Sequence, residues 1–199
     1  MLQRIAARRC QMGHRRSRGP RSPHRAGVLA GRGWPGLAPE RRFGPSLLLD
    51  VPMIFTYEDL QVGTRFESHA MTVTTDDVLE FAHRFDPQIA HADPVAARDT
   101  FFGAHVASGW HTCALTMRLM FDSMPLAGGI VGGGVDELRW PHALRPGDTI
   151  HLESEVVEMR TLKSRASTGL VKFRCVTLNQ RGQAVQTMLP NLFVSRKTA

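Results

Sequence analysis

Two segments in the first half of the globular sequence have apolar residues at helical spacing. The first segment predicts an amphipathic helix, because its apolar residues recur every three or four positions: Val78, Phe81, Ala82 and Phe85. Thr74 and Asp77 resemble a capping box at the start of this helix. Pro87 cannot extend a helix and disfavours the α conformation for the residue before it, so we expect the helix to end at about Phe85.

The second helical segment, from His111 to Asp122, is apolar on nearly every side. Such a helix is expected to be buried, with Met117 and Met120 filling the core. Between the two segments, Asp93 followed by a proline predicts the N-cap of a short helix that continues through Arg98.

The second half of the chain alternates apolar and polar residues in the way half-buried antiparallel strands do. The alternating apolar positions are Ile150, Leu152 and Val156, and then Val171, Phe173 and Cys175. A turn at 179–182 precedes a last strand over 183–196, and residues 66–74 are also strand-like. The glycine-rich run 128–134 lacks the phosphate-loop pattern, so we interpret it as a strand that approaches the buried helix closely. The order of these elements predicts an α+β fold.

Composition divides the chain at about residue 52. Residues 1–50 contain 11 arginines and only two acidic residues, whereas residues 51–199 contain 14 basic and 16 acidic residues. The globular part, 53–199, is long enough for one core and is not basic, so a nucleic-acid partner is not expected. Residues 1–52 predict a disordered Arg/Gly/Pro-rich extension, and deleting them should leave folding unchanged. A mitochondrial transit peptide, a basic binding arm and translation from Met53 stay open as alternatives.

Three kinds of site and partner are not favoured by the sequence. No run of apolar residues is long enough to span a membrane. The spacing of His91, Asp93, His105 and His111 matches no standard zinc pattern, so neither a metal nor a cofactor is expected. The three cysteines, Cys10, Cys113 and Cys175, lack redox spacing, and the last two fit small core residues in a reducing, cytoplasmic compartment.

Asp86 and His91 are the candidate catalytic residues. They lie five positions apart, on backbone that we expect to be irregular after Pro87, between two helical segments. Catalytic groups concentrate on such connections. A carboxylate and an imidazole that reach the same water could move protons in both directions near neutral pH.

The surrounding motifs resemble those of the MaoC-like dehydratases, the (R)-specific enoyl-CoA hydratases of the hot-dog fold. The resemblance spans about residues 57–196 and is carried by 81–88, 91–93, 102–103, 108–110, 134–141 and 145–149. It implies an antiparallel sheet wrapped around a long buried helix, a homodimer, and hydration of a trans-2-enoyl-CoA by Asp86 and His91. It also places the thioester carbonyl at Gly109, where the helix N-terminus favours a negative oxygen. Ile89-Ala90 stands where the family has Asn-Pro, which leaves the acyl substrate open.

Two other functions remain as alternatives. A hot-dog thioesterase would hydrolyse the same thioester, but it often carries its acid on the central helix, where this chain has only Asp122 at the far end. A non-catalytic acyl-CoA-binding or partner subunit is the second alternative. A hydratase of this kind would act in fatty acid metabolism. The sequence fixes neither the pathway nor the length of the acyl group.

Overall fold

The computed structural model describes residues 54–197, and the extension predicted for 1–52 lies outside the described residues. The elements in chain order are η1 (Tyr57–Asp59), β1 (Arg65–Glu67), β2 (Met71–Thr72), α1 (Thr75–Phe85), α2 (Ile89–Ala92), η2 (Ala96–Asp99), α3 (Gly109–Ser123), β3 (Val131–Arg139), β4 (Thr149–Thr161), β5 (Thr168–Asn179) and β6 (Ala184–Ser195). No helix among these residues is long and apolar enough to cross a membrane.

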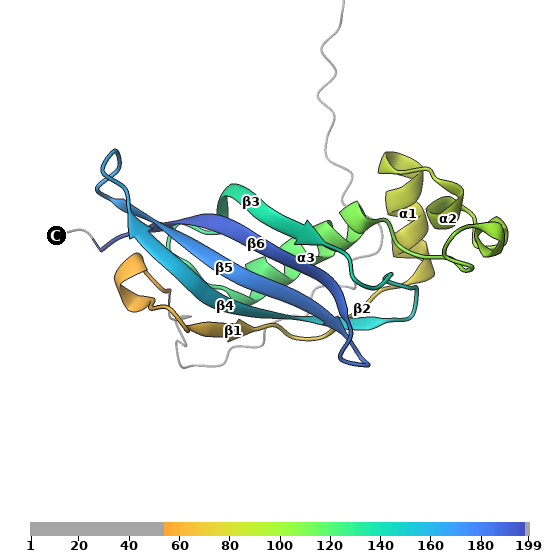
Figure 1. Ribbon diagram of the computed structural model, residues 1–199, viewed down its shortest axis with the longest axis horizontal. Helices are drawn as coiled ribbons and strands as arrows, with labels where there is room; N and C mark the ends of the chain where they lie inside the picture. Colours follow the sequence, from red (N-terminus) through yellow and green to blue (C-terminus); the bar gives the residue numbers. More distant parts are fainter. Residues whose placement is uncertain (1–53, 198–199) are drawn as a thin grey trace, which may run out of the picture. The chain divides into compact units, whose positions relative to one another are not determined.

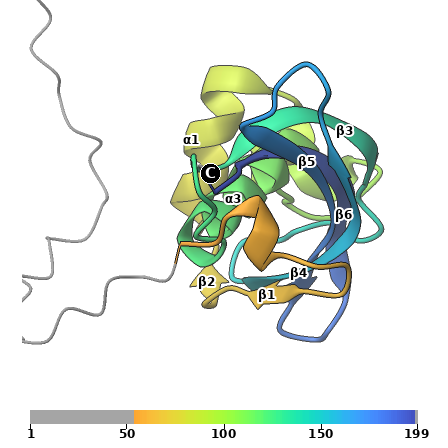
Figure 2. The same ribbon diagram turned by 90° about the vertical axis from the view of Figure 1, so that its left-hand side faces the viewer.

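A single antiparallel sheet, in the order β1-β4-β5-β6-β3, curves around α3, with β2 also paired to β4 (Figures 1 and 2). The register of β4 against β5 pairs Ile150 with Asn179 and Val156 with Phe173. One face of each long strand is buried and the other is not, as the alternation in the sequence predicted. This is the α+β hot-dog arrangement expected from the sequence.

The core lies between the concave face of the sheet and one side of α3. Leu119 and Met120 of the helix and Phe173 of the sheet are fully buried within it. A buried hydrogen bond between the hydroxyls of Thr116 and Thr177, 2.8 Å long, ties the helix to β5. Because buried polar groups need partners, this pair fixes the rotation of α3 on the sheet as well as its position.

The opposite side of α3 is exposed, which corrects the prediction that the whole helix is buried. Met117 is 47% exposed, while Met120 fills the core as predicted. Trp110 and Phe121 are exposed on the same side as Met117. The sheet covers only one side of the helix, and no other described element covers the second.

Two predictions for the strands were also wrong in detail. The strand expected over 66–74 is divided into β1 and β2, because Ser68 turns its hydroxyl onto the backbone, accepting from Leu152 N and donating to His69 O. The glycine-rich run enters a strand, β3, at Val131, but its close approach is not to the helix. A side chain at Gly133 would meet the ring of Phe193 on β6 at 2.9 Å.

The elements that carry the candidate site are α1, α2 and the start of α3, which lie together at one end of the sheet (Figure 1). The capping box predicted for α1 is present: Asp77 N donates to the Thr74 hydroxyl, and the Asp77 carboxylate accepts from Thr74 N. The helix ends at Phe85, as Pro87 predicted. The short helix expected after Asp93 is a 3-10 turn at Ala96–Asp99, and the Asp93 carboxylate accepts from Val95 N and Ala96 N.

Candidate active site

Asp86 stands at the C-terminal end of α1, where Pro87 stops the helix. Its own N–H still donates to Ala82 O, but its backbone turns away from helical geometry. Gln88 N then donates to Asp86 O, which begins the turn into α2. The carboxylate is therefore aimed by backbone that is held on both sides.

His91 lies on α2, one helical turn long, rather than on the irregular backbone we expected. The reason is that the Gln88 carbonyl accepts from His91 N and Ala92 N and so starts a new turn directly after the proline. The His91 residue is 7% exposed. Burial on a short, hydrogen-bonded turn gives the imidazole a defined direction.

The hydrogen-bond partner of one ring nitrogen of His91 shows which nitrogen carries the proton. Nδ1 lies 2.9 Å from the carbonyl oxygen of Val106, and because a carbonyl can only accept, Nδ1 carries the proton and donates. In the neutral ring, Nε2 then has the free lone pair. Nε2 lies 3.7 Å from Asp86 Oδ2. The two catalytic candidates thus face each other at a distance at which one water beside them can contact both.

The Asp86 carboxylate is held by two further side chains. Oδ2 accepts from the Ser108 hydroxyl at 2.6 Å, and Oδ1 accepts from Gln88 Nε2 at 2.7 Å. Burial raises the pKa of Asp86, but the hydrogen bonds from Ser108 and Gln88, with the nearby His91, outweigh it and leave the pKa below its ordinary value. Asp86 is therefore a carboxylate at neutral pH, able to accept a proton.

Gly109 is the first residue of α3, as the sequence predicted, and Ser108 is its N-cap. The Ser108 oxygen accepts from Trp110 N at 3.2 Å while its hydroxyl donates to Asp86, so one side chain joins the helix start to the acid. Among the described residues no hydrogen-bond acceptor for Gly109 N–H is found. The structure thus brings Asp86, His91 and the start of α3 to one place.

Sequence reasoning missed Ser108, Gln88 and Trp140. Ser108 could have been found as the N-cap residue of the predicted helix. Trp140 packs so closely on Gly109 that a side chain at this glycine would lie 2.8 Å from the indole ring. The indole N–H donates to Gln186 Oε1 at 3.1 Å, which holds the ring against the helix start.

The four residues weighed as metal ligands do not come together. Asp93 caps the turn after α2, and His105 Nε2 contacts His91 O at 2.8 Å, so both already have structural partners. Among residues 54–197 no group of three or more metal-ligating side chains is found. Burial raises the pKa of Cys113 and raises that of Cys175 to about 11, so neither is a nucleophile at neutral pH. Cys10 lies outside the described residues.

His111 lies two residues into α3 and is only 6% exposed. Its ring stacks on Phe81 of α1, with centroids 4.7 Å apart, and Nδ1 is buried without a hydrogen-bond partner among the described residues. Burial lowers the pKa of His111 from its ordinary value of 6.5, and Asp77 opposes this only in part. The neutral ring is therefore a structural link between α1 and α3.

We expect this histidine to weaken the fold in acid. Below about pH 6.5 the unfolded chain protonates His111 while the folded chain resists, so the unfolded state binds more protons and stability falls as pH falls. His111→Phe keeps the stack but cannot be protonated. Denaturant unfolding from pH 7.5 to 5.5 should show a smaller acid-induced loss in this variant, by up to about 1.4 kcal/mol per pH unit. His83→Gln, an exposed change on α1, should follow wild type, and a parallel loss in His111→Phe would contradict the assignment.

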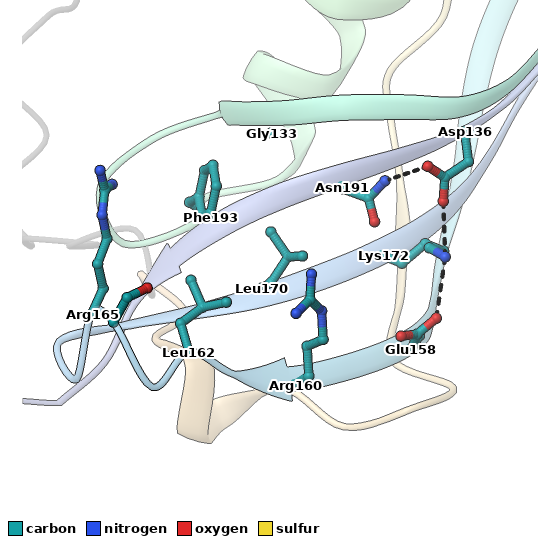
Figure 3. Close-up of a pocket in the computed structure, with 11 residues that line it drawn as sticks. Gly133, Asp136, Glu158, Arg160, Leu162, Arg165, Leu170, Lys172, Asn191 and Phe193 are labelled. Carbon is teal, nitrogen blue, oxygen red and sulfur yellow. Dashed lines mark hydrogen bonds and ion pairs between the residues drawn. The ribbon is translucent and has the colours of Figure 1, made fainter.

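A hollow lies on the other face of the sheet, away from α3 (Figure 3). It has a volume of about 540 Å³ and contains Arg160, Arg165 and Lys172. Lys172 contacts Asp136 at 2.9 Å and Glu158 at 3.2 Å, so its charge is already balanced. None of the candidate catalytic residues lines this hollow.

Comparison with known proteins agrees with the fold. The profile of the MaoC-like domain family matches residues 59–174. The crystal structure of a MaoC-like dehydratase from Rhodospirillum rubrum is 44% identical, with a TM-score of 0.70, over 73% of this chain and 99% of that one. The protein YdeM of Bacillus subtilis is 26% identical over 62% of this chain and 87% of its own length. An R-hydratase from Pseudomonas aeruginosa shares the fold at 24% identity, with a TM-score of 0.57 over 72% and 86% of the two chains.

The class of fold defined by the curved antiparallel sheet and the central helix that it wraps is the hot-dog fold. Within that class, the chain belongs to the MaoC-like dehydratase family.

Proposed function

We propose that the protein catalyses the reversible addition of water to a trans-2-enoyl thioester, an enoyl-CoA, giving the (R)-3-hydroxyacyl thioester. The observation that carries the proposal is the facing pair: Oδ2 of the ionised Asp86 lies 3.7 Å from Nε2 of His91, whose ring is oriented by the hydrogen bond between Nδ1 and Val106 O. Similarity to a MaoC-like dehydratase and to an R-hydratase supports the reaction class and its stereochemistry.

In this reaction the pair both takes and returns one proton. A water held between Oδ2 and Nε2 loses a proton to the pair while its oxygen bonds to the β-carbon. The electrons of the alkene move toward the thioester carbonyl, and the pair then protonates the α-carbon. Atoms and charge balance without an oxidant or reductant, so the step requires no redox cofactor.

The negative charge that develops on the thioester oxygen needs a donor. Gly109 N–H at the start of α3 fits this role, because it has no acceptor among the described residues and the helix N-terminus favours negative charge. The side chain of Ser108, the residue before Gly109, accepts from Trp110 N and donates to Asp86, and so connects the helix start to the carboxylate. The geometry thus couples the acid–base pair to the stabilisation of the oxyanion.

The thioesterase alternative has less support. Asp122, the acid on the central helix, accepts from Arg118 Nε at 2.8 Å and lies 4.0 Å from His69 Nε2, at the end of α3 far from Gly109. The Asp122 carboxylate is thus paired with Arg118, away from the helix start where the thioester is placed.

Crotonyl-CoA distinguishes the three functions in one experiment. The proposed hydratase removes the enoyl absorbance without releasing free thiol. A thioesterase releases thiol, and an acyl-CoA-binding subunit does neither. Loss of absorbance without thiol release supports the proposal. Thiol release contradicts it, and so does an absence of both changes with crotonyl-CoA and with trans-2-octenoyl-CoA.

We further propose that the protein is a homodimer that uses the exposed side of α3. Exposed apolar residues at helical spacing form a stripe on this helix, and exposed valines lie on β3, whose outer edge has no strand partner among the described residues. We call these residues the apolar face: Trp110, Met117, Phe121, Val131 and Val135. Apolar groups on a helix beside an open strand edge are typical of a self-association surface.

Phe121→Glu should therefore shift the protein to a monomer and lower its activity. A two-fold axis places the substitution in the interface twice, and burying one phenylalanine contributes about 1.5–3 kcal/mol, so dissociation should increase by at least about 10-fold. Analytical ultracentrifugation measures the mass. The matched control is Val62→Glu, which puts the same charge on an exposed apolar residue between η1 and β1 and should remain dimeric. A fully active wild-type monomer would overturn this proposal.

A further inference from the structure

The most buried catalytic candidate borders an exposed aromatic side chain. The ring of Phe102 lies 6.2 Å from the imidazole of His91, centroid to centroid, with the ring planes at 43°. Phe102 is 39% exposed whereas His91 is 7% exposed. An apolar ring thus lies beside a proton-transfer group, and part of the surface of that ring is exposed.

The loop that carries Phe102 is tied to the helix that carries His91. Val106 N donates to Ala90 O at 3.1 Å, and His105 Nε2 contacts His91 O at 2.8 Å. Gly103 N donates to Thr100 O and closes a turn around Phe102, with Gly103 at a φ of +61°. Phe102 is therefore held at a fixed place relative to the catalytic pair.

The chemistry of the substrate gives this ring a role. The β-carbon must come to within about 3–3.5 Å of a water held by Asp86 and His91. Carbons beyond the β-carbon do not react, and they extend from His91 into its surroundings. Among the described residues, Phe102 is the one aromatic ring in contact with the ring of His91.

We propose that Phe102 is a specificity-determining residue that contacts the acyl chain beyond the β-carbon and favours chains longer than four carbons. This proposal rests on the proposed hydratase function. Because Phe102 is partly exposed, it acts as a wall that gives contact area rather than as a plug that closes a cavity. Crotonyl-CoA, whose chain ends one carbon after the β-carbon, gains little from the ring.

The test compares crotonyl-CoA with trans-2-octenoyl-CoA. In Phe102→Ala, kcat/KM for the octenoyl substrate should fall by about 10-fold or more, which is the effect of losing one or a few methylene contacts. The value for crotonyl-CoA should stay within about 2-fold of wild type. Phe102→Leu keeps an apolar wall, so its kcat/KM for the octenoyl substrate should lie between those of wild type and Phe102→Ala. Thermal unfolding of both variants, measured alongside the rates, checks that they fold.

Phe101→Ala is the matched control. Phe101 is the same residue type, adjacent in sequence and 97% exposed, and its ring contacts Phe102 but not His91. Its substitution should leave the ratio of the two kcat/KM values unchanged. An equal change for both substrates in Phe102→Ala, or a gain for the longer one, overturns the role of Phe102 while leaving the hydratase in place. A wild-type protein that hydrates neither substrate refutes both proposals.

Discussion

Asp86→Asn should lower kcat for crotonyl-CoA hydration by about 10²-fold or more. The substitution is nearly isosteric and keeps an oxygen that can accept from Ser108, but an amide cannot take a proton from water. Because the group removed acts in the transition state, kcat should fall more than the affinity for substrate. Initial rates over a range of substrate concentrations separate the two.

His91→Ala should have an effect of similar size, because it removes the other side of the water site. If Asp86 and His91 act as a unit, the double variant should be little worse than either single variant. Asp93→Asn is the matched control: it makes the same change two residues from His91, and asparagine still caps the following turn. Near wild-type hydration by folded Asp86→Asn would show that the pair is not the catalytic site.

Gly109→Ala is the second change with a large expected effect. The new methyl group would lie 2.8 Å from the ring of Trp140, so either the ring or the helix start must move. Trp140 is held by Gln186, and the helix start carries Ser108, which orients Asp86. A displacement approaching 1 Å at the catalytic group costs about 10²-fold in rate, so kcat should fall by about 10- to 100-fold.

A double-variant cycle tests the reason for this loss. With Trp140→Leu in the background, the methyl group has room, so adding Gly109→Ala should cost less than about 3-fold in kcat. Unfolding measurements accompany the rates, because crowding in a packed region costs about 1–3 kcal/mol. Equal losses in both backgrounds would mean that Trp140 does not transmit the effect.

The parts of the fold that could be predicted from sequence depend on local rules. The start of α1 follows from Thr74 and Asp77, its end from Pro87, and the strands β4 and β5 from the alternation of apolar and polar residues. The Asp86–His91 pair could also be predicted from local sequence, because the two residues are only five positions apart. The predicted boundary between 52 and 53 stays a prediction.

What could not be predicted depends on contacts between distant residues. Ser108 reaches Asp86 across 22 positions, and the fit of Trp140 on Gly109 depends on a strand and a helix that meet only in the fold. The exposed side of α3 could not be recognised either. An apolar pattern such as Met117 and Phe121 is the same for a core and for a surface that another molecule covers.

The proton transfer proposed for Asp86 and His91 can be measured directly in D₂O. Hydration of crotonyl-CoA by the full chain should place one deuterium on the α-carbon, which remains after return to H₂O and is detected by mass spectrometry, whereas the hydroxyl deuterium exchanges. We expect this label in the product of the wild-type protein. Asp86→Asn should form almost no product and therefore no labelled product. An unhydrated thioester in the wild-type reaction, or labelled product formed equally fast by Asp86→Asn, would contradict it.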